Sequence, residues 1–466
     1  MLQLAANALA NPTHPAVVSD GQSYSYQSLL DASHRFSSLL LKDTDDLREV
    51  RVAYMVAPGF DYLRVQWGIW RAGGVAVPLC ITYPLPSLQY VIEDTGADIV
   101  VVGPEYASIL DTLAIEQGFR YIVLDQEREA EPKDLPDIDP TRRAMILYTS
   151  GTTNLPKGVV TTHANLNAQI STLVAAWEWS ATDHTLCILP LHHVHGIINV
   201  VSCALWAGAT VEFLPSFSAE GVFEAFQRGK INVFMAVPTI YFKLIAHWES
   251  LPTEEQKQIS DTLANFRLMV SGSAALPVSV MEKWKAISSH TLLERYGMTE
   301  IGMGISNPYQ GERRAGHIGQ PLPGVKVRLV NEQDQVLEAR QPGEIQVKGP
   351  NVFLEYWRKP EATQQAFTED GWFKTGDIAI VEDGYYRILG RDSIDIIKSG
   401  GYKISALEIE EVLRTHPAIA DCGVVGIPDE EWGELVVAAL VVNDPAFDTA
   451  TLTPWLRDRK STRLNS

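Results

Sequence analysis

Three things are scarce in this 466-residue chain: paired cysteines, positive charge and long apolar runs. Its four cysteines (Cys80, Cys187, Cys203, Cys422) form no C-x-x-C pair, which favours free thiols in a reducing compartment over a disulfide framework or zinc site. A formal charge of −19 disfavours nucleic acid or an anionic membrane as the main partner. We find no secretory signal and no run near the ~20 apolar residues of a membrane span. These absences predict a cytoplasmic enzyme, and they leave its oligomeric state open.

What is present is the composition of a globular protein, with 46% apolar and 20% charged residues. The length predicts two or more domains. Apolar, β-branched runs at 50–58, 74–80 and 97–104 read as buried strands, and 61–74 reads as a helix ended by glycines. This alternation predicts an α/β fold with largely parallel sheets covered by helices.

The stretch YTSGTTNLPKGVV (148–160) places hydroxyl residues around a glycine and a lysine. It follows the expected strand 144–150, and a helical pattern with one buried face begins near Leu166. A strand, a Gly-rich turn and a helix in this order present backbone N–H groups to phosphates. The P-loop spacing is absent, because Lys157 is followed by Gly158 and not by serine or threonine. From the residues alone, another kind of phosphate loop and an ordinary turn both stay open.

The composition of the sequence changes after GRDSIDIIKSGGYKI (390–404), which indicates a second domain. Ser405 and Glu408 predict a capping box for a helix through about residue 415. Strands at 421–428 and 434–443 would complete a small α+β unit. We therefore predict an N-terminal domain over 1–390 and a C-terminal domain over 391–466.

Seven stretches together resemble the adenylate-forming enzymes, which include acyl-CoA synthetases, luciferases and the adenylation domains of peptide synthetases. They are YTSGTTNLPKG, LPLHHVHG (189–196), SGSAAL (271–276), LERYGMTE (293–300), GWFKTGD (371–377), ILGRDSIDIIKSGGYKI (388–404) and EIEEVL (408–413). Within this family, the chain looks most similar to the malonyl-CoA synthetases. The resemblance implies that ATP converts a carboxylate into an acyl-adenylate and that the CoA thiol then displaces AMP, with Mg²⁺ as the metal and a role in fatty acid metabolism.

The resemblance also implies the residues that do this work. The ATP-binding residues would be Thr149, Ser150, Gly151, Thr152, Thr153, Lys157, Ser273, Ala274, Tyr296, Thr299, Asp377 and Arg391. The catalytic residues would be His193, Thr152, Glu300 and Arg391, with Glu300 also the Mg²⁺ ligand. A turn residue is the alternative for Asp377, and a surface ion pair is the alternative for Arg391.

The acyl substrate would contact His193, His195 and Arg295. We expect the two histidines to alternate along an extended segment and share one face, and acyl-site lining is favoured over metal binding by this pair. Arg295 points to the substrate class, because an unpaired buried guanidinium is costly unless a carboxylate meets it. Malonate or a methyl-substituted malonate would supply that carboxylate. The alternative is a structural ion pair with Glu294 or another acid, and it is the resemblance to malonyl-CoA synthetases that favours the dicarboxylate.

CoA would bind at Ser399, Gly400 and Gly401, where glycines permit close backbone approach, and a hinge is expected near Arg391–Asp395. Members of the family continue to a C-terminal lysine segment that is not found before Ser466, so we interpret the sequence as an incomplete copy of a functional enzyme. The alternative is a protein with impaired adenylation. Three other functions stay open: a synthetase for another short- or medium-chain acid, a domain that loads a carrier protein, and a nucleotide-binding protein without catalysis.

Overall fold

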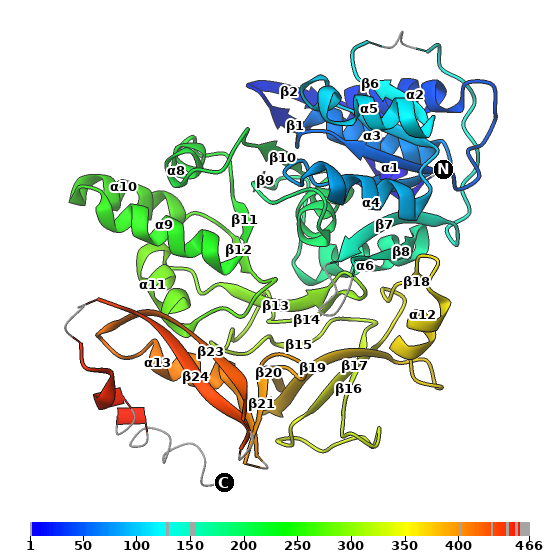
Figure 1. Ribbon diagram of the computed structural model, residues 1–466. Helices are drawn as coiled ribbons and strands as arrows, with labels where there is room; N and C mark the ends of the chain where they lie inside the picture. Colours follow the sequence, from blue (N-terminus) through cyan, green and yellow to red (C-terminus); the bar gives the residue numbers. More distant parts are fainter. Residues whose placement is uncertain are drawn as a thin grey trace.

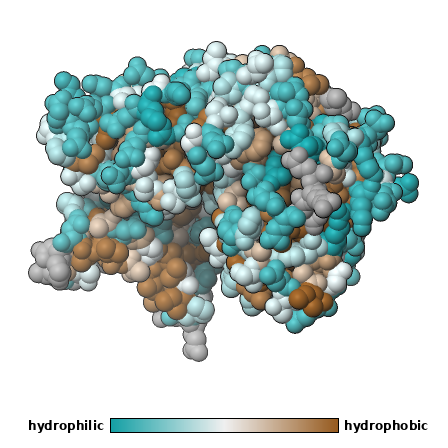
Figure 2. Space-filling view, turned by 90° about the horizontal axis from the view of Figure 1, so that it is seen from above, coloured by the Kyte–Doolittle hydropathy of each residue, from teal (hydrophilic) through white to brown (hydrophobic). Residues whose placement is uncertain are grey.

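The computed structural model describes residues 2–126, 130–149, 155–400, 402–429, 432–443, 447–452 and 455–456. These residues form four sheets, of which the two largest lie in the N-terminal part of the chain (Figure 1). Hydrophilic residues predominate on the face shown in Figure 2. In the part of the chain that the structure describes, no helix combines the length and apolar character needed to cross a membrane.

The first large sheet has seven strands, and its parallel members are joined by helices. Its order is β18 (Glu355–Tyr356), β8 (Lys157–Thr162), β7 (Arg143–Thr149), β4 (Val75–Pro78), β3 (Arg51–Met55), β5 (Ile99–Val102) and β6 (Arg120–Val123). The helices of this region are α2 (Tyr26–Leu41), α3 (Phe60–Arg71), α4 (Leu85–Thr95) and α5 (Ala107–Gln117). Strands β3, β4, β5 and β7 are fully or mostly buried, which explains their continuous apolar runs.

The second large sheet has nine strands and carries most of the candidate site. Its order is β15 (Gln320–Pro321), β14 (Gly302–Ser306), β13 (Leu293–Met298), β12 (Leu268–Ser271), β11 (Val233–Ala236), β9 (His184–Cys187), β10 (Thr210–Phe213), β1 (Pro15–Ser19) and β2 (Gln22–Ser25). The other N-terminal helices are α1 (Gln3–Ala8), α6 (His163–Ala176), α7 (Cys203–Ala207), α8 (Ala219–Gln227), α9 (Pro238–Ser250), α10 (Thr253–Leu263) and α11 (Val278–Ser288). Strands β9 to β13 pair in parallel, so their carboxyl ends meet at one edge, where loops form ligand sites.

Two four-stranded sheets follow. The first contains β16 (Lys326–Val330), β17 (Gly343–Lys348), β19 (Phe373–Glu382) and β20 (Tyr385–Arg391), with α12 (Pro360–Ala366) nearby in the chain. The second contains β22 (Tyr402–Ser405), β21 (Ile396–Ser399), β24 (Gly433–Val442) and β23 (Ile419–Asp429), with α13 (Ala406–Leu413) packed against β23. We call this last sheet and α13 the small unit. The chain passes from one sheet to the other between Arg391 and Ile396; the domain boundary itself stays a prediction.

The predicted α/β fold with a small α+β unit is confirmed, but two local predictions are wrong. The helix α6 does not follow the Gly-rich turn directly, because β8 pairs antiparallel with β7 and comes first. The run Val159–Val160 is fully buried there, and such β-branched residues favour a strand. Of the expected capping box, only the bond from the Glu408 N–H to the Ser405 hydroxyl forms, at 3.1 Å. The Glu408 carboxylate binds Arg387 instead.

Candidate active site

A cavity of about 2370 Å³ lies between the second large sheet and the small unit. Its walls include the loop after β12, the strand β13 and the turn after it, residues of β19 and β20, and helix α13. The predicted site residues on this wall are Thr149, Lys157, His193, His195, Ser273, Ala274, Arg295, Tyr296, Thr299, Glu300, Asp377 and Arg391. The fold thus brings together residues that are far apart in the sequence.

Arg295 lies on this wall with a side chain that is almost fully buried. Its Nη2 donates to the Ser273 hydroxyl at 3.3 Å, and its Nε has no partner among the described residues. No carboxylate of the described chain lies within ion-pair distance. Glu294, the predicted alternative partner, precedes Arg295 on β13, and successive strand residues point to opposite faces. Burial lowers the pKa of Arg295 to about 9, so the group is a cation at neutral pH.

The backbone at Gly272 and Ser273 leaves room for the Arg295 guanidinium. A Cβ on Gly272 would lie 2.5 Å from the Arg295 Cζ, closer than carbon atoms can approach, so only glycine permits this packing. Ser273 has a φ of +71°, a left-handed conformation that costs free energy for a residue with a Cβ. Such local strain persists where the surrounding contacts fix it, and here Ser273 holds Arg295.

His193 and His195 both reach the cavity, although the predicted extended segment is wrong. His195 begins a π-helix, His195–Ser202, while His193 lies in the bend before it. Since a guanidinium cannot accept, the Ser273 hydroxyl accepts from Arg295, and it also forms a hydrogen bond with the His195 Nδ1 at 3.2 Å. Burial, reinforced by the charge of Arg295, holds the pKa of His195 well below its usual range. His195 is therefore neutral at physiological pH.

A second polar cluster joins Tyr296, Asp377 and Arg391. The Tyr296 hydroxyl donates to Asp377 Oδ2 at 2.6 Å. Arg391 donates to the same carboxylate through Nε at 2.9 Å and Nη2 at 3.4 Å. These bonds link β13 of the second large sheet to β19 and β20, so the ion pair of Arg391 is part of the cavity wall and not an isolated surface pair.

Glu300 is buried beside the cavity, and its Oε1 accepts from the Tyr356 hydroxyl at 2.9 Å. Burial raises the pKa of Glu300. Lys157 begins β8, and its Nζ lies 5.1 Å from the centre of the Tyr356 ring, a distance at which the face of the ring attracts a cation. Among the described residues no group of three or more His, Cys, Asp or Glu could hold a metal. A single carboxylate on the cavity wall, that of Glu300, nevertheless fits Mg²⁺, which commonly takes one or two carboxylates plus phosphate oxygens and water.

Comparison with known proteins identifies the family. The profile described as "AMP-binding enzyme" matches residues 4–357, more than half of the chain. The chain belongs to the AMP-binding enzyme family. The profile of the AMP-binding enzyme C-terminal domain matches residues 408–462. The predicted membership of the adenylate-forming family is thereby confirmed.

One relative and two solved structures of other proteins resemble this AMP-binding enzyme over most of its length. The mitochondrial malonate–CoA ligase of Bos taurus is 46% identical over 448 residues, which covers 88% of this chain and 76% of the relative. The ATP-bound crystal structure of MatB from Rhodopseudomonas palustris has a TM-score of 0.90 and 33% identity, covering 98% of this chain and 92% of that one. A malonyl-CoA ligase in a ternary product complex with methylmalonyl-CoA and AMP has a TM-score of 0.75 and 36% identity, covering 99% and 96%.

Some of the predicted site residues of the AMP-binding enzyme do not line the cavity, and others lie outside the described residues. Ser399 and Gly400 belong to β21 and the turn after it and do not line the cavity, and Gly400 donates its N–H to the Trp432 carbonyl at 2.8 Å. Their role in CoA binding stays a prediction. The predicted residues Ser150, Gly151, Thr152, Thr153 and Gly401 lie outside the described residues.

Sequence reasoning missed three residues of the site, namely Gly272, Tyr356 and Glu294. Gly272 stood inside the SGSAAL stretch, where only its closeness to Arg295 gives it a role. Tyr356 comes from β18, a two-residue strand with no pattern of its own. Glu294 is buried on β13, where its Oε1 accepts from the Leu276 N–H at 3.2 Å and its Oε2 has no partner among the described residues.

Glu294 should make the stability of the enzyme depend on pH. Burial, with Glu411 nearby, raises its pKa to about 8 from 4.5, so the folded state holds a proton that the unfolded state releases between these values. The contribution to stability is therefore lost progressively as pH rises from about 4.5 to about 8. Glu294→Gln keeps an acceptor for Leu276 without this proton, and we expect it to be more stable than wild type by about 5 kcal/mol at pH 9 and equal near pH 4.5. Urea unfolding at both pH values measures this, and equal slopes with pH in the two proteins would contradict it.

Proposed function

We propose that this AMP-binding enzyme is a malonate–CoA ligase, which forms malonyl-adenylate and pyrophosphate from malonate and ATP and then transfers the malonyl group to the CoA thiol with release of AMP. The main support for this proposal is the environment of Arg295. This residue is a buried cation on the cavity wall with no carboxylate partner among the described residues.

A dicarboxylate suits this cation better than a monocarboxylate. Removing a guanidinium from water is costly unless a charged partner replaces the lost hydration. The unpaired Nε of Arg295 offers a donor for the far carboxylate while the near carboxylate reacts. A fatty or aromatic acid would leave this cation uncompensated. The names of the bovine relative and of the malonyl-CoA ligase structure support the same substrate class.

The nucleotide is expected to lie near the cluster of Tyr296, Asp377 and Arg391. The charges of Lys157 and Arg391 face the side of the cavity where Glu300 lies, and fixed positive charge stabilises phosphate leaving as pyrophosphate. Mg²⁺ bound at Glu300 would supply further neutralisation of phosphate charge. The roles of the hydroxyl residues in the stretch 149–153 stay predictions.

Cellular location and metabolic role also stay predictions. We propose a cytoplasmic location and a place in fatty acid metabolism for this enzyme. The bovine relative, by contrast, is mitochondrial by name. The domain limits 1–390 and 391–466 and the hinge near Arg391–Asp395 are part of the same proposal.

The deciding experiment is ATP–pyrophosphate exchange with malonate, methylmalonate, acetate and a medium-chain acid, followed by thioester formation with CoA. The proposal expects exchange with malonate or methylmalonate well above that with the two monocarboxylates. A preference for a monocarboxylate would instead assign the chain to an acyl-CoA ligase for another acid. ATP binding without exchange for any acid would also contradict the proposal.

A further inference from the structure

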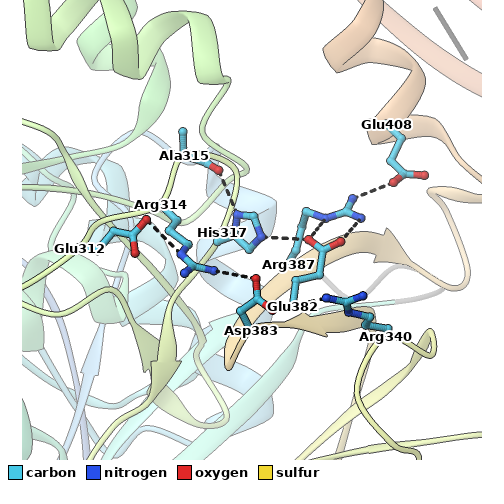
Figure 3. Close-up of polar contacts among 9 residues, drawn as sticks. All are labelled: Glu312, Arg314, Ala315, His317, Arg340, Glu382, Asp383, Arg387 and Glu408. Atoms are coloured by element: carbon cyan, nitrogen blue, oxygen red, sulfur yellow. Dashed lines mark hydrogen bonds and ion pairs between the residues drawn. The ribbon is translucent and has the colours of Figure 1, made fainter. Parts of the chain in front are cut away.

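Helix α13 carries the EIEEVL stretch, and its glutamates contact different parts of the protein. Glu408 accepts from Arg387 Nη1 of β20 at 2.7 Å. Figure 3 shows how this ion pair continues through Arg387 to Glu382 and then to His317. One turn after Glu408 along α13, Glu411 accepts at its Oε1 from the Val278 N–H at 3.1 Å. Two glutamates of the small unit thus contact the rest of the protein at two separate places.

The second contact lies at the start of helix α11. A helix leaves its first N–H groups without partners inside the helix, and a side chain usually supplies an acceptor. At α11 the N-cap position is Pro277, which makes no side-chain cap. Glu411, which follows Val278 by 133 residues, supplies the acceptor for the first residue of the helix. Its negative charge also suits the positive end of the helix dipole.

This helix start is continuous with the wall that holds Arg295. The segment Ser273–Pro277 leads from β12 to α11 and lines the cavity. Its first residue binds Arg295, as described above, and Leu276 near its end donates to Glu294. Pro277 has no N–H, so the next donor along the chain is Val278. The two backbone donors around Pro277 therefore bind one carboxylate from β13 and one from the small unit.

We propose that Glu411 is a positioning residue of the acyl pocket: it caps helix α11 from the small unit and so holds the segment Ser273–Pro277 in the form that places Arg295. This inference rests on the proposed function for its kinetic consequence, but its structural consequence can be measured without any substrate. It also gives the EIEEVL stretch a specific task, since Glu411 is the member that binds the first residue of α11, directly after the segment Ser273–Pro277.

The structural test is hydrogen exchange on the full chain. Glu411→Ala removes the acceptor, whereas Glu411→Gln keeps an oxygen at the same place. We expect amide exchange in the peptide covering residues 276–283 to quicken by ~10-fold in Glu411→Ala, and to stay near the wild-type rate in Glu411→Gln. Equal exchange in all three proteins would overturn the inference, whatever the substrate is.

The kinetic test measures malonate-dependent ATP–pyrophosphate exchange. Glu411→Ala should raise the KM for malonate by ~3- to 30-fold and change kcat less, with rescue in Glu411→Gln. Glu408→Ala serves as the comparison on the same helix, because it breaks the contact to β20 and leaves the contact to α11. We expect it to change the KM for malonate by less than Glu411→Ala does, and an equal increase would indicate general loosening of the small unit and overturn the inference.

A second variant removes the same bond from the other side. Val278→Pro deletes the N–H at the first position of α11, where proline is well tolerated. Pro277 has a φ of −58° and a ψ of 134°, which suits a residue before proline. If the bond is what matters, Val278→Pro and Glu411→Ala should each raise the KM, and the double variant should be no worse than the poorer single one. Multiplying effects would contradict the inference, while failure of wild type to use malonate would contradict only the proposed function.

Discussion

Arg295→Leu should lower kcat/KM for malonate by ~10³-fold, since deleting one partner of a buried charge pair costs several kcal/mol. The loss should appear mainly as a higher KM, because the far carboxylate is bound equally in the ground state and the transition state. Activity with acetate or a medium-chain acid should stay level or rise, since leucine removes a charge that these acids cannot compensate. Steady-state kinetics with each acid, at constant ATP and CoA, measures the change.

Two companion variants separate charge from geometry at this position. Arg295→Lys keeps the charge but loses the fork that binds a carboxylate at two points, so we expect an intermediate loss. Gly272→Ala keeps Arg295 but puts a methyl group where the guanidinium packs, so it should weaken malonate use without deleting the cation. Malonate turnover that persists in Arg295→Leu would remove the basis of the substrate assignment, while the family assignment would stand.

Asp377→Asn should lower kcat/KM for ATP by ~10²-fold. The carboxylate accepts from Tyr296 and from Arg391, and the amide has the same shape without the charge. Arg391, which is half-buried, would then lose the partner that fixes its direction in the cavity wall. The KM for malonate should change much less, because Asp377 belongs to the other polar cluster. Initial rates at varied ATP, with malonate saturating, test this.

Tyr296→Phe is the matched control for the second cluster. It deletes one hydrogen bond to Asp377 and leaves the ion pair with Arg391, so its effect on ATP use should be ~10-fold or less. If Asp377→Asn binds ATP as wild type does and instead loses thermal stability, the cluster is structural and the nucleotide lies elsewhere in the cavity.

Much of the fold could be predicted from the sequence, because local patterns determined it. The buried runs that became β3, β4 and β5 are continuous and apolar, as strands covered on both sides must be. Strand β8 was missed because its first residues, Lys157 and Gly158, were interpreted as the end of a phosphate loop. The prediction of an extended segment at His195 is also wrong. Alternation of histidines over three residues cannot distinguish an extended chain from the start of a π-helix.

The site was predictable where neighbours in sequence are neighbours in space. Arg295 and Tyr296 are adjacent on one strand, and the stretch LERYGMTE (293–300) predicted a place in the site for each of them. Contacts between distant segments gave no such signal, as with Glu300 and Tyr356, or Glu411 and Val278, because their partners are chosen by packing and not by spacing. Family resemblance supplied Asp377 and Arg391 as residues, but only the structure shows that they bind each other and Tyr296.

The strand β13 places an acid and a base on alternate sides within two residues. Glu294 accepts from the Leu276 N–H, and Arg295 donates to the Ser273 hydroxyl on the wall of the ligand space. Because side chains in a strand alternate with a period of two, gaining one residue near the start of β13 would move Glu294 to the position of Arg295. The cavity would then present an acid where the cation now stands and would repel anionic ligands. A change of length in this strand would therefore remove Arg295 from its place on the cavity wall, whereas a replacement at position 295 would change that side chain alone.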